Sequence, residues 1–399
     1  MSRPLSLPAP ILALPSRTPE LAALLESWSL INSGSGHLTG LERMRHALRA
    51  EFTRAFPAAL LEEPVLIGTT ARALRLRLRP SASRQILLNG HYDTVYEATD
   101  PFQTCSRPDA DTLRGPGVAD MKGGLVVLLA ALQTFEQAPG ASALGWEILL
   151  TPDEETGSHG SAPLFIAAAT RHTFALVFEP ARPSGDIVQS RKGTGSFIAT
   201  CRGRAAHAAQ VPSSGRNAIL ALAEFLLAAA KIPSELPGVL VNVGNIRGGG
   251  TATNVVPDFA QSELDVRITR VADREPLLAR LHALAAIIDG RDGFRLELTG
   301  CFNRPPKECS PVEQAAFAAW QHAARDLGQI PPNWVHSGGG SDGNLLFAAG
   351  LANLDAVGPL GDHLHSDREC VVISSLATRA QIVALFLTRY AAGEVTLPR

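Results

Sequence analysis

The residues with the clearest chemical potential follow a segment that is typical of a buried strand, residues 146–150. Three consecutive acids come directly after it: Asp153, Glu154 and Glu155. Adjacent carboxylates beside a core repel one another once they lose water. Such a cluster is stable when a cation lies among it or when it is an ordinary solvated loop, and the local sequence leaves both interpretations open.

Two more predicted strands end at residues that can bind a metal. The segment 85–88 is followed by His91, and the segment 174–178 by Glu179. In open α/β sheets, ligands bind at the edge formed by the carboxyl ends of the strands. We therefore expect His91, Glu155 and Glu179 to lie at one edge of a sheet.

A glycine-rich turn at residues 114–124 carries Asp120 and starts a predicted helix. The turn lacks the GxxxxGK[ST] spacing of a phosphate loop, and its acid would repel phosphate, so Asp120 fits a metal better. Near the end of the chain, the polar segment 361–369 contains His365. His363 in the same segment is an alternative ligand.

These side chains offer two imidazoles and three carboxylates, a donor set that suits zinc, cobalt or manganese. Two metal ions could share the set if one carboxylate bridged them. Glu154 could then take a proton from an attacking water, and Asp93 could hold the second nitrogen of a ligating histidine. The proposed ligands are His91, Asp120, Glu155, Glu179 and His365.

The pattern around these residues predicts an α/β protein with an inserted domain. Residues 193–298 are predicted to run strand–helix–strand–strand–helix–strand, which is the ferredoxin-like order. We expect residues 1–191 and 304–399 to form the main domain and residues 192–303 the insertion. Further helices are predicted at residues 18–30, 40–56, 124–137, 311–327 and 374–392.

Composition narrows the class of protein. The chain has 399 residues, 45% of them hydrophobic, and a formal net charge of −2. The sequence has no stripe of Lys and Arg, so we do not expect it to bind nucleic acid. Its longest apolar runs are too short to cross a bilayer. Prolines interrupt the apolar residues near the N-terminus, so we expect no export signal. The five cysteines form no CxxC pair, which favours a cytoplasmic protein without a disulfide framework.

The sequence resembles the M20 family of metallopeptidases, in particular its carboxypeptidase G2-like (glutamate carboxypeptidase) branch, within the acetylornithine deacetylase–succinyl-diaminopimelate desuccinylase superfamily. The similar stretches follow the family order along nearly the whole chain. They are residues 90–95 (GHYDTV), 115–124 (GPGVADMKGG), 153–158 (DEETGS), 178–180 (FEP), 203–208 (GRAAHA), 254–257 (NVVP), 265–267 (DVR), 338–342 (GGGSD) and His365-Ser366.

The resemblance implies a mixed-sheet zinc-peptidase catalytic domain with helices on both faces, plus an inserted ferredoxin-like α+β dimerisation (lid) domain. It implies two Zn²⁺ ions, replaceable by Co²⁺ or Mn²⁺, that hydrolyse the amide bond beside a free α-carboxylate. Asp120 would bridge them. His91 and Glu179 would complete one site, and Glu155 and His365 the other. Glu154 would be the general base, and Asp93 would orient His91.

The resemblance also implies roles for residues in or near the insertion. His207 would reach into the partner of a homodimer and stabilise the oxyanion. Asn254, Arg267, Gly339 and Gly340 would bind the substrate, an N-acyl amino acid or a short peptide. Three simpler interpretations stay open: a solvated loop histidine, an asparagine that only shapes its turn, and an arginine paired with Asp265 or Glu263.

Rival functions are an N-acetyl or N-succinyl amino-acid deacylase, a dipeptidase, a non-catalytic relative and a serine hydrolase. The last rests on GxSxG around Ser341, with Asp355 and His365 following in the required order. Residues 331–338 are, however, too polar for the buried strand that this motif needs. Too few residues separate Ser341 from His365 for the strands of that fold.

Overall fold

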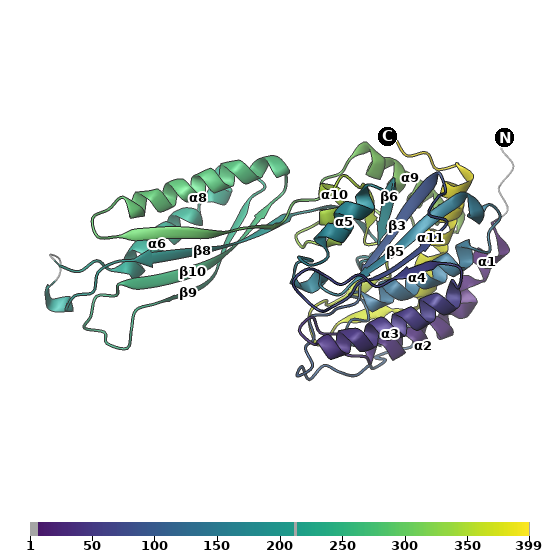
Figure 1. Cartoon of the computed structure of the whole chain (residues 1–399), viewed down its shortest axis with the longest axis horizontal. Coiled ribbons are helices and arrows are strands. Elements are labelled where there is room, and N and C mark those ends of the chain that lie inside the picture. Colours follow the sequence, from purple (N-terminus) through teal and green to yellow (C-terminus); the bar gives the residue numbers. More distant parts are fainter. Residues whose placement is uncertain (1–6, 211–213, 399) are drawn as a thin grey trace. The chain divides into compact units, whose positions relative to one another are not determined.

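The computed structural model describes residues 7–210 and 214–398, and the chain divides into two compact units (Figure 1). The main unit comprises Met1–Ser190, Cys309–Ser337 and Ser341–Arg399. The inserted unit comprises Arg191–Glu308 and Gly338–Gly340. The sequence had assigned residues 191, 304–308 and 338–340 to the main domain, whereas their contacts group them with the insertion.

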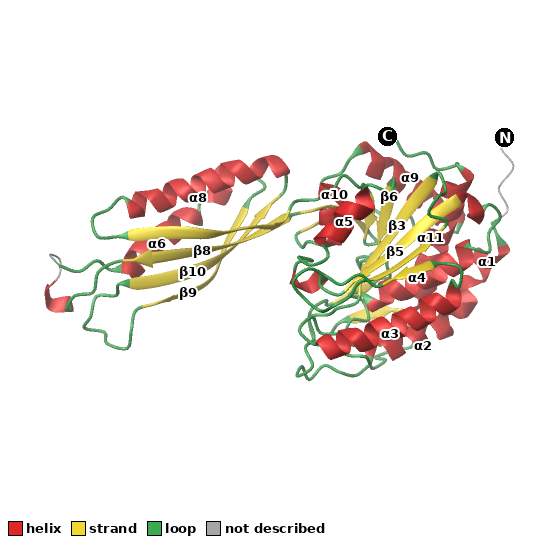
Figure 2. Cartoon of the chain, viewed as in Figure 1, coloured by secondary structure: helices red, strands yellow, loops and turns green. Residues whose placement is uncertain are grey.

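The main unit contains an eight-stranded mixed sheet among its described residues, in the order β1-β2-β5-β3-β6-β13-β7-β12. Figure 2 labels its central strands β5, β3 and β6. The four central strands β5, β3, β6 and β13 run parallel, while β2 is antiparallel to β5 and β7 to β13. The strands are β1 Leu60–Glu62, β2 Leu74–Leu78, β3 Arg84–His91, β5 Leu144–Thr151, β6 Phe174–Val177, β7 Ile187–Arg191, β12 Trp334–Ser337 and β13 Asn353–Asp355.

Helices cover both faces of this sheet, as the resemblance implied. Successive side chains of a strand point to opposite faces, so Leu88 joins a core with α2, α4 and α11, while Leu87 joins a second core with α5 and α10. The helices are α1 Ala9–Ala13, α2 Thr18–Ser29, α3 Leu38–Ala55, α4 Lys122–Phe135, α5 Ala162–Ala169, α9 Pro311–Asp326, α10 Asp342–Ala348 and α11 Ile373–Ala392.

A small three-stranded sheet of the main unit has the order β14-β15-β4. Its strands are β14 Gly361–Asp362, β15 Cys370–Val372 and β4 Thr112–Arg114. Cys370 pairs with Arg114 in the antiparallel ladder between β15 and β4. This ladder places the segment that carries His365 beside the turn that carries Asp120.

The inserted unit has the predicted ferredoxin-like topology. Its four antiparallel strands lie in the order β11-β8-β10-β9, and α6 and α8 pack their apolar residues against the sheet. The elements are β8 Gly193–Arg202, α6 Ala218–Ala229, α7 Ile232–Glu235, β9 Leu240–Gly248, β10 Phe259–Ile268, α8 Arg274–Asp289 and β11 Arg295–Arg304.

The main departures from the predicted elements occur where apolar periodicity is weak. The strand predicted at residues 85–88 continues through Asn89 and Gly90, so His91 ends β3 instead of following it. Gly90 allows close packing there, because a Cβ would meet the side-chain ends of Leu125 and Met121 at 2.7 and 2.9 Å and would force them to shift. Among the described residues, no helix combines the length and hydropathy needed to span a membrane.

Candidate metal centre

Three adjacent strands of the main sheet end at one edge and present acids and a histidine there. His91 is the last residue of β3 and pairs in register with Thr151, the last residue of β5. The 3₁₀ turn η3 (Glu154–Thr156) follows β5, and Glu179 follows β6. The expected convergence of His91, Glu155 and Glu179 is therefore present at the carboxyl ends of parallel strands.

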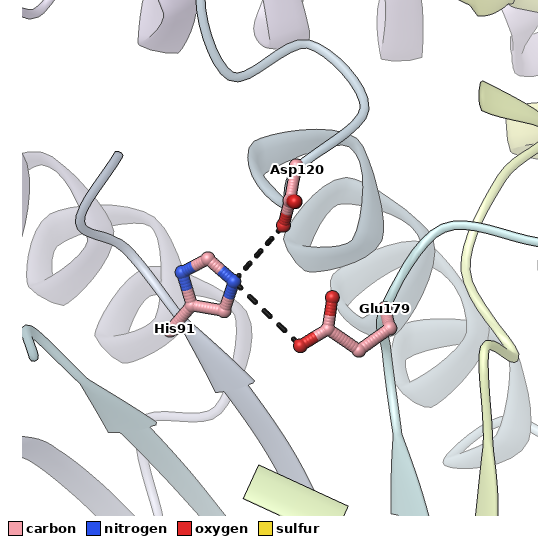
Figure 3. Close-up of side chains that lie close together, drawn as sticks. All are labelled: His91, Asp120 and Glu179. Carbon is pink, nitrogen blue, oxygen red and sulfur yellow. Dashed lines mark hydrogen bonds and ion pairs between the residues drawn. The ribbon is translucent and has the colours of Figure 1, made fainter. Parts of the chain in front are cut away.

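The first cluster, called the buried triad, consists of His91, Asp120 and Glu179 (Figure 3). His91 Nε2 lies 3.1 Å from Asp120 Oδ1 and 3.7 Å from Glu179 Oε1. One potential ligand atom from each residue lies within 4.8 Å of the others. All three side chains are buried, so water alone does not offset their charges.

The second cluster, called the open triad, consists of Asp120, Glu155 and His365. His365 Nε2 lies 3.2 Å from Asp120 Oδ2 and 3.3 Å from Glu155 Oε2. The side chain of His365 is 53% exposed, although Asp120 and Glu155 are largely covered. Asp120 thus directs one carboxylate oxygen toward each histidine, and the two triads share this residue.

Mutual hydrogen bonds govern the pKa values of these groups. Hydrogen bonds to Asp120 and then to Glu155 raise the pKa of His365 to about 11. Burial, followed by the charge of Asp120, raises the pKa of Glu155 to about 8. Burial opposes ionisation of Asp120, yet hydrogen bonds from both histidines hold its pKa below the usual value. Positive charge between these residues therefore stabilises the cluster.

The residues of the two triads fit divalent cations. Glu155 Oε1 is buried and has no hydrogen-bond partner in the described part of the chain. A buried carboxylate oxygen without a partner is costly, and a cation held by Glu155 and His365 would satisfy it. Imidazole nitrogens combined with carboxylate oxygens are ligands that zinc, cobalt and manganese accept.

Asp93 contacts both the histidine and the acidic turn. Its Oδ1 lies 3.3 Å from His91 Nδ1, the contact expected of an orienting residue. The same carboxylate accepts the backbone N–H groups of Glu154 and Glu155, each at 3.1 Å, and the hydroxyl of Ser35 at 2.8 Å. The sequence did not predict these additional contacts, which fix η3 relative to His91.

The three consecutive acids have different surroundings, and they do not form a simple solvated loop. Asp153 accepts the backbone N–H groups of Gly160 and Ser161 at 2.8 and 3.1 Å, just before α5. Glu154 is buried, whereas Glu155 belongs to the open triad. Asp153 therefore stabilises the loop, while Glu154 and Glu155 lie at the edge of the sheet where the triads are.

Glu369 is a buried carboxylate for which no contact with a metal was predicted. It accepts the backbone N–H groups of Ala119 and Asp120 at 2.8 and 2.9 Å, and the hydroxyl of Tyr96 at 2.7 Å. Burial, followed by the charge of Asp120, raises the pKa of Glu369 to about 7. Its place in the motif of His365-Ser366 was a sequence signal, but the polarity of the segment did not indicate that Glu369 is buried.

The other predicted site residues belong to the inserted unit. His207 and Asn254 are exposed and neighbouring, since His207 pairs with Val255 in an isolated bridge and the Ala208 N–H donates to the Asn254 carbonyl at 2.8 Å. The carbonyls of Gly339 and Gly340 accept from the Arg191 guanidinium at 3.3 and 3.5 Å.

Arg267 already has two partners in this structure. Its Nε lies 3.0 Å from Asp265 Oδ2, and its Nη1 donates to the Gly338 carbonyl. One of the simpler interpretations, an ion pair with Asp265, is therefore present. A guanidinium has five N–H donors, so these two contacts leave donors with which Arg267 could bind a carboxylate of a ligand.

The environment of Ser341 excludes the serine-hydrolase alternative. Ser341 is fully buried, caps α10 by accepting the Gly343 N–H at 3.0 Å, and donates to Asp355 Oδ2 at 2.7 Å. His365 instead faces Asp120 and Glu155. A nucleophilic serine needs a histidine base within hydrogen-bond reach, and Ser341 has a structural role instead.

Comparisons with known proteins give matches that cover most of the chain. Residues 87–389 match Peptidase family M20/M25/M40. Carboxypeptidase G2 of Pseudomonas sp. (strain RS-16) is 25% identical over 94% of this chain and 90% of its own. Succinyl-diaminopimelate desuccinylase of Paracidovorax citrulli is 30% identical over 77% of this chain and 81% of its own. The crystal structure of aminopeptidase PepT from Bacillus cereus superposes with a TM-score of 0.79 at 21% identity, covering 94% of this chain and 99% of that one.

Proposed function

Because the chain belongs to the peptidase M20/M25/M40 family and is a hydrolase of that family, we propose that it cleaves the amide bond beside a free α-carboxylate. The products would be those of a carboxypeptidase or an N-acyl-amino-acid amidohydrolase. The observation that carries the proposal is the position of Asp120. Its two carboxylate oxygens face histidines of two different triads at 3.1 and 3.2 Å, which is the arrangement that a bridging ligand requires.

The proposed cofactors are two Zn²⁺ ions per chain, with Co²⁺ or Mn²⁺ as substitutes. The buried triad would hold one ion and the open triad the other. When bound, two such ions polarise a carbonyl and increase the acidity of water at neutral pH. The buried, unpartnered Oε1 of Glu155 supports this assignment.

Glu154 is the proposed general base. It takes a proton from the attacking water and transfers it to the leaving nitrogen, so that the amide is cleaved without a covalent intermediate. Asp93 holds the Glu154 N–H and faces His91 Nδ1. It thereby positions the base and one histidine of the buried triad together.

Residues of the inserted unit are proposed to recognise the substrate. Arg267 would bind its free carboxylate through paired hydrogen bonds, assisted by Asn254, Gly339 and Gly340. His207 would stabilise the oxyanion formed at the scissile carbonyl, acting on a substrate held by a second copy of the chain. Mixing His207→Ala with Glu154→Ala protein should then restore activity in hybrid dimers. No restoration would show that His207 acts within its own chain.

A homodimer is the proposed assembly, and the surface of the inserted unit supports it. β9 is an edge strand whose residues are almost all exposed, including the apolar Leu240, Val243 and Ile246. An unpaired edge strand with apolar side chains is a site for pairing with another chain. Sedimentation should detect a dimer that Ile246→Lys weakens. A monomeric wild-type protein would contradict the proposal.

A second candidate function is N-acetyl or N-succinyl amino-acid deacylation, which the desuccinylase relative favours. A dipeptidase would use the same centre. We also propose a cytoplasmic location, because all five cysteines are free thiols. The deciding experiment is a turnover screen of zinc- or cobalt-loaded protein against N-acyl amino acids and dipeptides. Activity should require a free α-carboxylate and disappear with chelator. Turnover that survives exhaustive chelation would reject metal-dependent hydrolysis.

A further inference from the structure

We propose that Glu369 is a positioning residue that fixes the shared ligand Asp120, so that both cation sites depend on a carboxylate that touches neither. The inference rests on the proposed two-cation function. It concerns residues that the proposed reaction does not use. Asp120 and His365 are 245 residues apart in the sequence. The structural basis of the proposal is a set of contacts that connects the segments carrying these two residues.

The small sheet brings Glu369 to this place. Glu369 directly precedes β15, and Gly115 directly follows β4, so the antiparallel pairing of these strands sets the two residues side by side. The Gly115 N–H donates to the Glu369 carbonyl at 3.2 Å and extends the ladder by one bond. The Glu369 side chain is thereby directed beneath the turn that leads to Asp120.

The carboxylate of Glu369 accepts hydrogen bonds from three backbone N–H groups of that turn. Oε1 accepts from Ala119 and Asp120 at 2.8 and 2.9 Å, and Oε2 accepts from Gly117 at 3.3 Å. The backbone of Asp120 is thus held directly, and with it the direction of both of its side-chain oxygens. Glu369 is fully buried, so water does not replace these bonds if the carboxylate is withdrawn.

The same residue also holds the histidine segment. Tyr96 Oη lies 2.7 Å from Glu369 Oε2 and 2.8 Å from the Ser366 carbonyl, which follows His365 in the chain. Tyr96 is itself buried. Glu369 and Tyr96 therefore connect the turn of Asp120 with the loop of His365 through backbone groups, without contacting the side chains of either triad.

Glu313 provides a matched control for a purely structural role. It is fully buried like Glu369, and it accepts the Ser310 N–H at 3.1 Å, the Asn353 N–H at 3.2 Å and the Ser310 hydroxyl. Those bonds cap α9 and join it to β13, and no triad residue takes part. Shortening either acid by one methylene keeps its charge and withdraws it from its donors.

The test measures Co²⁺ binding to metal-free protein, by titration of Co²⁺ absorption and by equilibrium dialysis with metal analysis, alongside thermal unfolding. Glu369→Asp should lower the affinity of both sites for Co²⁺ by about 10–100-fold, the usual effect of losing a residue that orients metal ligands. Tyr96→Phe should lower these affinities less, by about threefold or more. Glu313→Asp should lower Tm while leaving both affinities within about threefold of wild type.

Glu369→Asp protein that binds both ions as wild type does would overturn the proposal. So would a loss confined to one ion, or an equal loss in Glu313→Asp. If Glu369→Asp protein does not fold, unchanged affinities in Tyr96→Phe would overturn it instead. Wild-type protein that binds no Co²⁺ would reject the proposed function itself, which is a separate result.

Discussion

The buried and open triads share Asp120 but differ in how the protein surrounds them. The side chain of His91 is 1% exposed and has Asp93 on its other ring nitrogen. The side chain of His365 is 53% exposed and lies in the loop between β14 and β15. The shared carboxylate of Asp120 therefore joins the buried triad, whose histidine is fixed at a strand end, to the open triad, whose histidine is accessible to solvent. We expect substrate to approach the open triad.

Removing the shared ligand Asp120 should empty both triads, despite their different surroundings. Asp120→Ala deletes both oxygens that face the histidines, so both ions and all measurable turnover should be lost. Metal analysis after dialysis and an amidase assay would detect this. Asp326→Ala, which removes a surface acid paired with Arg389, should retain two ions and full activity. An Asp120→Ala protein that keeps one tightly bound ion would show that the triads do not depend on a common ligand.

Glu154→Gln should leave both triads intact and remove only the base. Glu154 contacts Asp93 through its backbone N–H, and the amide side chain preserves its size. We expect kcat to fall by about 10²–10⁴-fold, the usual contribution of a general base. Two bound ions should remain by metal analysis. Activity within threefold of wild type would refute the assigned role.

Substituting each histidine in turn should show that the two triads contribute differently to the stability of the metal-free protein. His91→Ala leaves buried carboxylates without their partner and should lower the free energy of unfolding by about 3–5 kcal/mol. His365→Ala removes a half-exposed partner of Asp120 and Glu155, and it should cost less than His91→Ala does. Urea unfolding of both variants measures the difference. Equal losses would contradict the contrast in burial.

The pH dependence should report on the open triad. Folding raises the pKa of His365 from 6.5 to about 11 and that of Glu155 from 4.5 to about 8. A raised folded pKa means that the native state binds more protons, so its stability falls as pH rises. The Tm of metal-free protein should therefore decrease between about pH 4.5 and 8 because of Glu155, and between about pH 6.5 and 11 because of His365. His365→Ala protein should show a smaller decrease, and an equal decrease would exclude His365 as its source.

The sequence predicted those parts of the molecule in which residue type or apolar period carries the information. β5 and α11 follow from their apolar residues, and the ferredoxin-like insertion follows from its order of elements. His91, Glu155 and Glu179 were recognisable because they lie at or just after the ends of predicted strands, whereas Asp120 was recognised in a glycine-rich turn and His365 in a polar segment. Whether each side chain performs its assigned role is a matter for the experiments above.

Other features could not be predicted because they depend on packing between distant segments. β14 has only two residues and β4 and β15 three each, so no periodicity identifies the sheet that places Glu369. The second task of Asp93 depends on N–H groups of η3, and any residue type except proline would supply them. Likewise, residues 338–340 group with the insertion through contacts between distant segments, among them the hydrogen bonds that Arg191 and Arg267 donate to their carbonyls.

The most direct measurement is an anomalous difference map, collected at the zinc absorption edge from crystals of the zinc-loaded protein. It should show two peaks about 3.5–4 Å apart, one within each triad, with Asp120 between them. A single peak, or two peaks without Asp120 as a common ligand, would contradict the account.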